Sequence, residues 1–313
     1  MNQGKKLAES GVLLALTILM LLMFLYIPVL GIILFFFMPA PFALVASKYD
    51  LKWSTIFLIA ALLITFILGN VALLPITLTV GLVGMTIGYY IRTNRSKLEM
   101  FIISTLLFIA SMLLSFLAAM YLMDINVVDS FFKMLESSTE QAGQSLKALG
   151  QEEKLDQLLD QLVQFKSLFQ TLLPSLLVLS SMIMTALMVL ASKAVINRSR
   201  FAKLEIGSVR DIKLPRSLLW YYLLSMLFIL FMHPEQGDYF YTVLMNIQFI
   251  LEFFIMLQGI SFMFFYSRSK GWSKGIPIVV VVLAFFIPIA SSFVRILGIM
   301  DLGFRIRESI ASK

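Results

Sequence analysis

The sequence predicts an all-α fold: a polytopic transmembrane helical bundle of about eight to nine spans, with an extracytoplasmic amphipathic helical insertion. Hydrophobic residues make up 60% of the 313-residue chain and charged residues only 14%, whereas a soluble domain has about 25% charged residues. The apolar residues form blocks that can cross about 30 Å of hydrocarbon, a distance that takes about 20 helical residues. Because backbone polar groups in lipid must be satisfied internally, these blocks are expected to be helices.

Nine apolar blocks justify the span count, and eight spans is the alternative. The second block contains Pro39 and Pro41 and the seventh is short, so either could be tilted, re-entrant or interfacial. The blocks are Gly11 to Tyr26, Val29 to Ala46, Ser54 to Gly69, Val71 to Ile91, Met100 to Met123, Thr171 to Ser192, Ser217 to Phe231, Phe240 to Tyr266 and Ile276 to Met300. The first block follows Lys5 and Lys6 as a secretory signal would, but no small-residue cleavage site follows it, which favours a retained helix.

Basic residues indicate the orientation of the bundle. Lys and Arg collect in alternate loops, as is typical of cytoplasmic loops, so we expect a multi-pass protein of the bacterial cytoplasmic membrane with a cytoplasmic N-terminus. The formal charge of +7 is assigned to these loops, and no nucleic-acid partner is expected. The basic tail 301–313 does not fit this orientation, because nine crossings place its basic residues Arg305, Arg307 and Lys313 outside the cytoplasm.

The polar stretch Asp124 to Gln170 contains eight acidic and four basic residues. Its second half repeats apolar residues at helical spacing, and Gly143 or Gly150 could turn the chain, which predicts a helical hairpin. Solvated helix extensions without function are the alternative. The predicted regions are a transmembrane bundle of about five spans at 1–123, the acidic insertion at 124–170, a bundle of about four spans at 171–300, and the tail at 301–313.

Ionisable and amide residues inside the apolar blocks are the candidate binding residues, because an unpaired charge in hydrocarbon is costly. Glu252 lies near the middle of its block with Gln248 one turn before it, and Arg295 is the natural partner. These residues could line a polar cavity for a ligand, ion or proton, or could join two helices. Asn246 on a flanking face is a further candidate, and Asn70 is a pocket candidate or part of a tight turn.

Small residues indicate helix packing. Gly11 and Ala15 lie in the first block, and Gly84 and Gly88 form a GxxxG spacing in the fourth. Such spacings let helix backbones approach closely. We expect packing within the bundle more than a subunit interface.

Several chemistries are excluded by residue content. The chain has no cysteine and one histidine, His233, which leaves no thiolate metal site and no multi-histidine centre. No P-loop, GxSxG or acidic metal-binding run is present. The sequence therefore predicts no catalytic residue, no metal and no cofactor, and a protein that is not an enzyme. A lipid-modifying enzyme is kept as an alternative, ranked below the two functions described at the end of this subsection.

Landmarks along the first half carry a family resemblance: Lys5 and Lys6, Pro28, Pro39-Ala40-Pro41, the Lys48 to Trp53 loop and Tyr89-Tyr90-Ile91-Arg92. With the acidic insertion and the later spans, they resemble the YybS-like family of bacterial predicted membrane proteins. The N-terminal half of that family is similar to the S components of energy-coupling-factor (ECF) transporters, which bind a vitamin or related small molecule and depend on separate ATPase and coupling subunits. Gly11 to Ala15 only approximates their Ala-x-x-x-Ala contact motif.

Two function classes follow. The first is a small-molecule binding or transport subunit of the membrane, in which Gln248 and Glu252 hold the ligand and the acidic hairpin acts as a lid. Its partners would be the lipid bilayer, a small-molecule ligand and membrane proteins including a coupling module. The alternative is a non-transporting scaffold or regulatory partner of cell-envelope or signalling proteins, acting through its basic loops or its hairpin.

Overall fold

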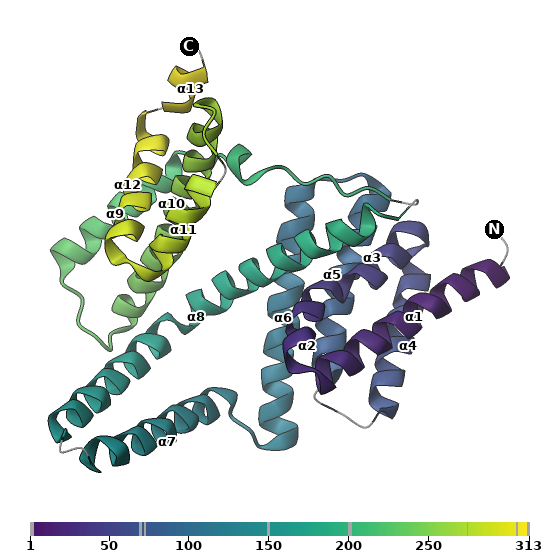
Figure 1. Ribbon diagram of the computed structural model, residues 1–313, viewed down its shortest axis with the longest axis horizontal. Helices are drawn as coiled ribbons and strands as arrows, with labels where there is room; N and C mark the ends of the chain where they lie inside the picture. Colours follow the sequence, from purple (N-terminus) through teal and green to yellow (C-terminus); the bar gives the residue numbers. More distant parts are fainter. Residues whose placement is uncertain are drawn as a thin grey trace. The chain divides into compact units, whose positions relative to one another are not determined.

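The computed structural model describes residues 3–68, 71, 73–148, 151–199, 202–273, 275–304 and 306–311. Every regular element in these ranges is a helix, which confirms the predicted all-α class (Figure 1). The elements are α1 (Gln3–Tyr26), α2 (Pro28–Phe37), α3 (Pro39–Lys48), α4 (Leu51–Ile67), α5 (Leu73–Thr93), α6 (Lys97–Met123), α7 (Val127–Ala148), α8 (Glu152–Ile196), the 3-10 turn η1 (Val209–Asp211), α9 (Ser217–Met232), α10 (Tyr239–Ser269), α11 (Gly275–Phe286), α12 (Pro288–Phe304) and α13 (Ile306–Ala311).

All nine apolar blocks are helical in the described residues, but they do not all have the length of a span. Among the described residues, six helices are long and apolar enough to cross a membrane, or up to seven if α11 and α12 together make one span. Residues Val29–Lys48, which include the proline-containing second block, pass this test. The helices α4 and α9 have 17 and 16 residues, somewhat short for about 30 Å of hydrocarbon.

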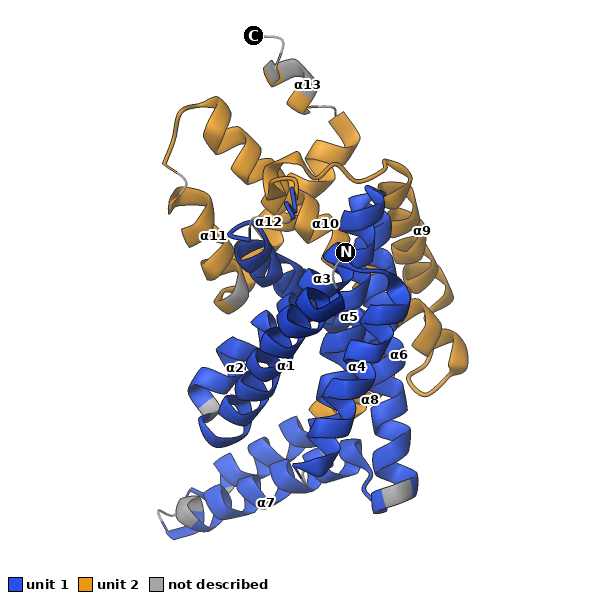
Figure 2. Cartoon of the chain, turned by 90° about the vertical axis from the view of Figure 1, so that its right-hand side faces the viewer, with its two compact units in different colours: residues 1–163, 177–205 blue, residues 164–176, 206–313 orange. Residues whose placement is uncertain are grey.

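The chain divides into two compact units, drawn in two colours in Figure 2. Unit 1 contains residues 1–163 and 177–205, and unit 2 contains residues 164–176 and 206–313. The 45-residue helix α8 contributes to both units, and the region boundary expected at 170/171 lies inside it. Each unit is described by itself below.

Close packing of α5 against α3 forms the centre of unit 1. A Cβ atom on Gly84 would lie 2.7 Å from Cβ of Phe42, and one on Gly88 would lie 2.6 Å from Cβ of Ala46. Such distances leave no room for a side chain. Gly84 and Gly88, which form the GxxxG spacing, are therefore the residues at which α5 packs against α3. Gly11 differs, because no atom lies within 4 Å of the position that its Cβ would occupy.

Polar side chains tie four helices together at one end of unit 1. Lys6 of α1 pairs with Asp50, just before α4, at 3.1 Å. The Tyr49 hydroxyl, just after α3, donates to Glu9, and Arg92 of α5 donates to the Tyr49 carbonyl. Burial, together with the bond to Glu9, raises the pKa of Tyr49 to about 12. The N-terminal part of α1, the loop after α3 and the loop after α5 therefore lie at one end of this unit. This agrees with the expectation that these basic segments share one side of the membrane.

The acidic insertion forms a helical hairpin, as its sequence pattern predicts. In Figure 1, α7 and the start of α8 lie side by side. Gly143 of α7 contacts the Leu155 side chain of α8, where a Cβ would lie 2.6 Å from Cδ1. Phe132 and Leu155 are 2% and 9% exposed, whereas Leu158 and Leu159 are 38% and 41% exposed, so the apolar faces of the two helices are covered only in part. Gly150, one of the two expected turn residues, lies outside the described residues.

In unit 2, the helices α10 and α12 cross at very short range. A Cβ on Gly298 would overlap the carbonyl oxygen of Ile255, and one on Gly259 would overlap that of Val294. Ile255 is fully buried at this crossing, where it packs with Tyr222 and Leu302. The two glycines permit the backbones to touch, as in other membrane helix pairs.

The ninth apolar block is not one straight span. Residues Gly275–Ala284 and Pro288–Phe304 are bent by 118° relative to one another. Pro288 begins α12, and because proline has no backbone N–H it cannot continue the hydrogen bonding of α11. The bend is compatible with a broken span or with a re-entrant loop. The crossing of Ile276 to Met300 therefore stays a prediction, and so does the side on which the tail lies.

Candidate functional site

Four polar side chains form a connected chain on α9, α10 and α12. Ser225 donates a hydrogen bond to the Gln248 carboxamide oxygen. Gln248 donates to Glu252 at 3.4 Å, and Arg295 pairs with the same carboxylate oxygen of Glu252 at 3.0 Å. Tyr222 lies beside Gln248, Glu252 and Arg295. The sequence expectation that Arg295 is the partner of Glu252 is therefore met by the geometry.

The Glu252–Arg295 pair is not sealed in the core. The two side chains are 33% and 32% exposed, although Glu252 lies 13 residues from the start of the 31-residue helix α10. Opposite charges favour each other strongly in a poorly polar environment, and each would be costly alone. The arrangement can thus hold a charged or strongly polar group without creating an unpaired charge.

Asn246 has a different environment, next to a proline inside α8. Its Oδ1 accepts from the backbone N–H of Ser175 at 2.9 Å, and its Nδ2 donates to the Thr171 carbonyl at 2.7 Å. In an unbroken helix these two backbone groups would bond to each other, and Pro174 between them disturbs that pairing. The carboxamide of Asn246 therefore bonds to backbone groups on both sides of Pro174. Asn70, the remaining predicted residue, lies outside the described residues.

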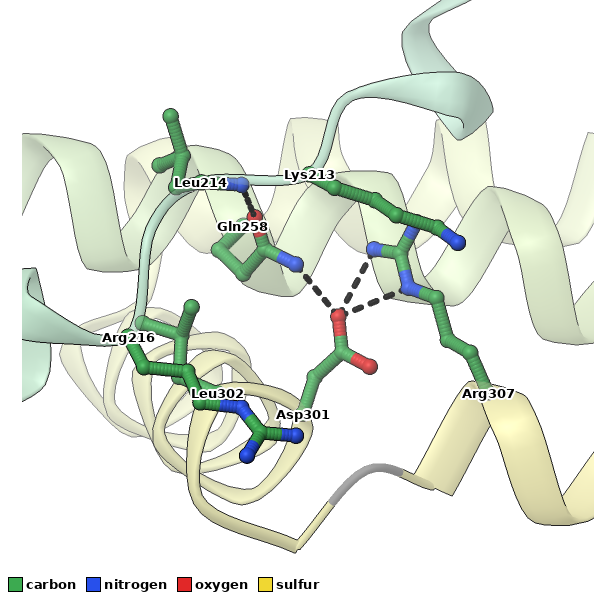
Figure 3. Close-up of a pocket in the computed structure, with 7 residues that line it drawn as sticks. All are labelled: Lys213, Leu214, Arg216, Gln258, Asp301, Leu302 and Arg307. Carbon is green, nitrogen blue, oxygen red and sulfur yellow. Dashed lines mark hydrogen bonds and ion pairs between the residues drawn. The ribbon is translucent and has the colours of Figure 1, made fainter.

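A second polar cluster lies at the end of unit 2 that contains η1 (Figure 3). Oδ2 of Asp301 accepts from Arg307 Nε at 2.7 Å and from Gln258. Arg307 also donates to Ser261 and to the carbonyls of Arg210 and Ile212, while Gln258 accepts from the Leu214 N–H at 3.0 Å. Asp301 and Arg307 are 8% and 5% exposed. We call this cluster the Arg307 clamp, because it holds the 206–216 loop against α10 and α12.

Sequence reasoning missed the Arg307 clamp, since Asp301 and Arg307 were assigned to a surface tail. One signal was present in the sequence: an aspartate that directly follows an apolar block needs a partner, and a basic residue follows six positions later. The clamp places the tail and the loop before α9 at the same end of unit 2. Within the described ranges, no group of three or more His, Cys, Asp or Glu side chains could hold a metal ion.

Comparison with known proteins identifies the family. The DUF2232 family, described as a predicted membrane protein, matches residues 15–302. This chain belongs to the DUF2232 family. It is also 27% identical to the "Uncharacterized protein YybS" of Bacillus subtilis (strain 168) over 310 residues, which cover 99% of this chain and 100% of that protein. The comparison with solved structures found no match. The YybS-like resemblance is confirmed, and this DUF2232 member is an integral membrane protein with several apolar helices.

Proposed function

We propose that this DUF2232 protein is a binding or transport subunit of the bacterial cytoplasmic membrane for a small molecule with a charged polar group. The observation that supports the proposal best is the partly open Glu252–Arg295 pair near the middle of α10. A structural pair between two helices is expected to be covered on all sides, because exposure to lipid costs free energy. An accessible pair can instead exchange part of its mutual attraction for bonds to a ligand.

The neighbours of the pair support a role in orientation. Ser225 and Gln248 form a hydrogen-bonded chain that ends on Glu252, so the carboxylate is held by its neighbours. A ligand cation would bind Glu252, a ligand anion would bind Arg295, and the Gln248 amide would bind an uncharged polar group. Asn246 is assigned to the backbone groups of α8 beside Pro174, and it is not part of this proposed site.

The sidedness of the protein is part of the proposal. The basic loops and the N-terminus share one end of unit 1, and the 206–216 loop shares one end of unit 2 with the tail. We assign both ends to the cytoplasm, since Lys and Arg are retained there. The acidic α7–α8 hairpin is then extracytoplasmic, where it could act as a lid.

A coupling partner follows from the similarity to S components. The α1 face with Gly11 and Ala15 is exposed and lines an apolar groove of about 500 Å³ together with Leu14, Ile18, Leu19, Leu22 and Ile64. A surface of small residues admits close approach of another helix. We assign this face to a membrane-embedded coupling subunit.

The test is native mass spectrometry of the gently solubilised protein, in which co-purified metabolites are compared between the wild type and Glu252→Gln. We expect at least a tenfold loss of the bound metabolite in this variant, because the ion pair and one ligand bond disappear. Glu235→Gln, in the exposed turn before α10, is the matched control and should retain it. The double variant Glu252→Gln/Arg295→Gln removes both charges and should fold but not bind. Normal binding by Glu252→Gln would remove this residue from the site.

A scaffold is the second candidate function, and the Arg307 clamp favours it. Four hydrogen bonds from the cluster to the backbone and side chains of the 206–216 loop and α10 give that loop one defined conformation. A basic loop that is fixed in this way is suited to docking a partner. Co-purification of a protein subunit, without any small molecule, would favour the scaffold over the binding subunit.

A further inference from the structure

Two basic side chains beside the Arg307 clamp are not used by it. Lys213 and Arg216 are both exposed. Figure 3 shows them extending from the loop that crosses above Gln258, and none of the drawn bonds reaches either one. Within the described part of the chain, neither has an acidic partner. Both cations would attract an anion.

The two cations line a small cavity of about 100 Å³. Its other charged lining residues are Asp301 and Arg307, which neutralise each other at 2.7 Å. The excess charge of the lining is therefore that of Lys213 and Arg216. The helix α9 begins next to them at Ser217 without a side-chain cap. The N–H groups of Leu218 and Leu219 already donate to the carbonyls of Pro215 and Arg216, so the attraction for an anion comes from the two side chains.

An apolar groove along α9 begins one helical turn after Arg216. Trp220, Leu223 and Leu227 follow Arg216 at intervals of four, three and four residues, so they lie on its face of the helix. The groove measures about 930 Å³ and is lined by Trp220, Leu223, Leu224, Met226, Leu227, Ile229, Leu230 and Gln248. Along the chain, the positively charged cavity is thus followed by the elongated apolar groove of α9.

The position along α9 fits the boundary between lipid and water. Trp220 and Tyr221 are 70% and 61% exposed, and such aromatic residues are enriched at membrane interfaces. The polar loop precedes them and the apolar part of α9 follows them. A ligand that joins an anionic head to a hydrocarbon chain matches this order of polarity.

We propose that Lys213, Arg216 and the apolar face of α9 form a binding site for an anionic phospholipid. The phosphate group binds between the two basic side chains, and one acyl chain lies along Trp220, Leu223 and Leu227. Gln248 lines the groove as well as the proposed ligand site. The proposal does not depend on the proposed function, because it rests on Lys213, Arg216 and the apolar side chains of α9. Basic residues near a membrane contribute about 1 kcal/mol each to binding of anionic lipids, so the loss of both should weaken binding about thirtyfold.

The experiment measures lipid adducts on the full-length protein by native mass spectrometry during titration with phosphatidylglycerol or phosphatidylcholine. We expect retained phosphatidylglycerol on the wild type and about thirtyfold weaker retention on Lys213→Gln/Arg216→Gln. Arg198→Gln/Lys203→Gln is the matched control, since it removes the same charge from exposed residues earlier in the same connection, and it should bind like the wild type. A third variant, Leu227→Asp, keeps both cations but places a charge in the groove, and it should also lose the lipid.

Three results would overturn the proposal. Equal retention of the two lipids would show that the surface holds only ordinary surrounding lipid. An equal loss in both double variants would show a general effect of net charge. Displacement of the lipid by glycerol phosphate or inorganic phosphate at matched concentration, with no effect of Leu227→Asp, would assign the cavity to a soluble phosphate compound. Thermal unfolding of each variant in detergent confirms that the loss does not come from misfolding.

Discussion

At the scale of single residues, the polar side chains of unit 2 have three distinct uses. Asn246 satisfies the backbone beside a proline, Asp301 and Arg307 compensate each other in the core, and Glu252 and Arg295 stay partly open. Sequence spacing could predict that Glu252 and Arg295 face each other, because both lie inside apolar blocks where a charge needs a partner. It could not assign Asn246 to Pro174, since nothing local links residues more than seventy positions apart.

The Arg307 clamp predicts a large loss of stability when one partner is removed. Arg307→Met leaves the Asp301 carboxylate buried without its counter-ion, which costs about 3–5 kcal/mol, and it removes the bonds to the 206–216 loop. Unfolding in detergent should occur at a clearly lower temperature, and proteases should cut the loop faster. Arg198→Met, at an exposed loop position, is the control. A variant as stable as this control would show that the clamp does not hold the fold.

The bridge between Asn246 and α8 predicts coupling between two substitutions. Asn246→Leu leaves two backbone groups without partners and should cost about 1–3 kcal/mol. In a Pro174→Ala background the helix can bond Ser175 to Thr171 directly, so the same substitution should cost less. Unfolding free energies of the two single variants and the double variant measure this difference. Equal costs in both backgrounds would contradict the bridge.

At the scale of elements, the apolar pattern was sufficient to locate the helices. It did not predict where a helix bends or which helix it packs against. The α7–α8 hairpin was predictable, because three- and four-residue spacing with nearby glycines indicates two helices and a turn. The bend between α11 and α12 was not, since Pro288 lies in an unbroken apolar run and a proline there is compatible with a kinked span. The backbone contact at Gly259 and Gly298 likewise depends on the packing partner and not on local sequence.

At the scale of the whole molecule, the positions of the loops predict which segments share a side of the membrane. The absence of cysteine from the sequence makes single-cysteine labelling direct. With a membrane-impermeant maleimide, Asp129→Cys and Glu235→Cys should react in intact cells. Ser208→Cys and Ile310→Cys should react only after permeabilisation, because the Arg307 clamp places the tail beside the 206–216 loop. Labelling of Ile310→Cys in intact cells would contradict the assigned sidedness of the tail.

The sequence separation within the Arg307 clamp has a consequence for biosynthesis. Arg307 bonds to carbonyl groups 97 and 95 residues before it. During synthesis, α9 and α10 can therefore enter the membrane before Arg307 has left the ribosome, while the 206–216 loop still lacks these bonds. Unit 2 completes its fold only after Arg307 has emerged, and a chain truncated before Arg307 would insert these helices without fixing the loop.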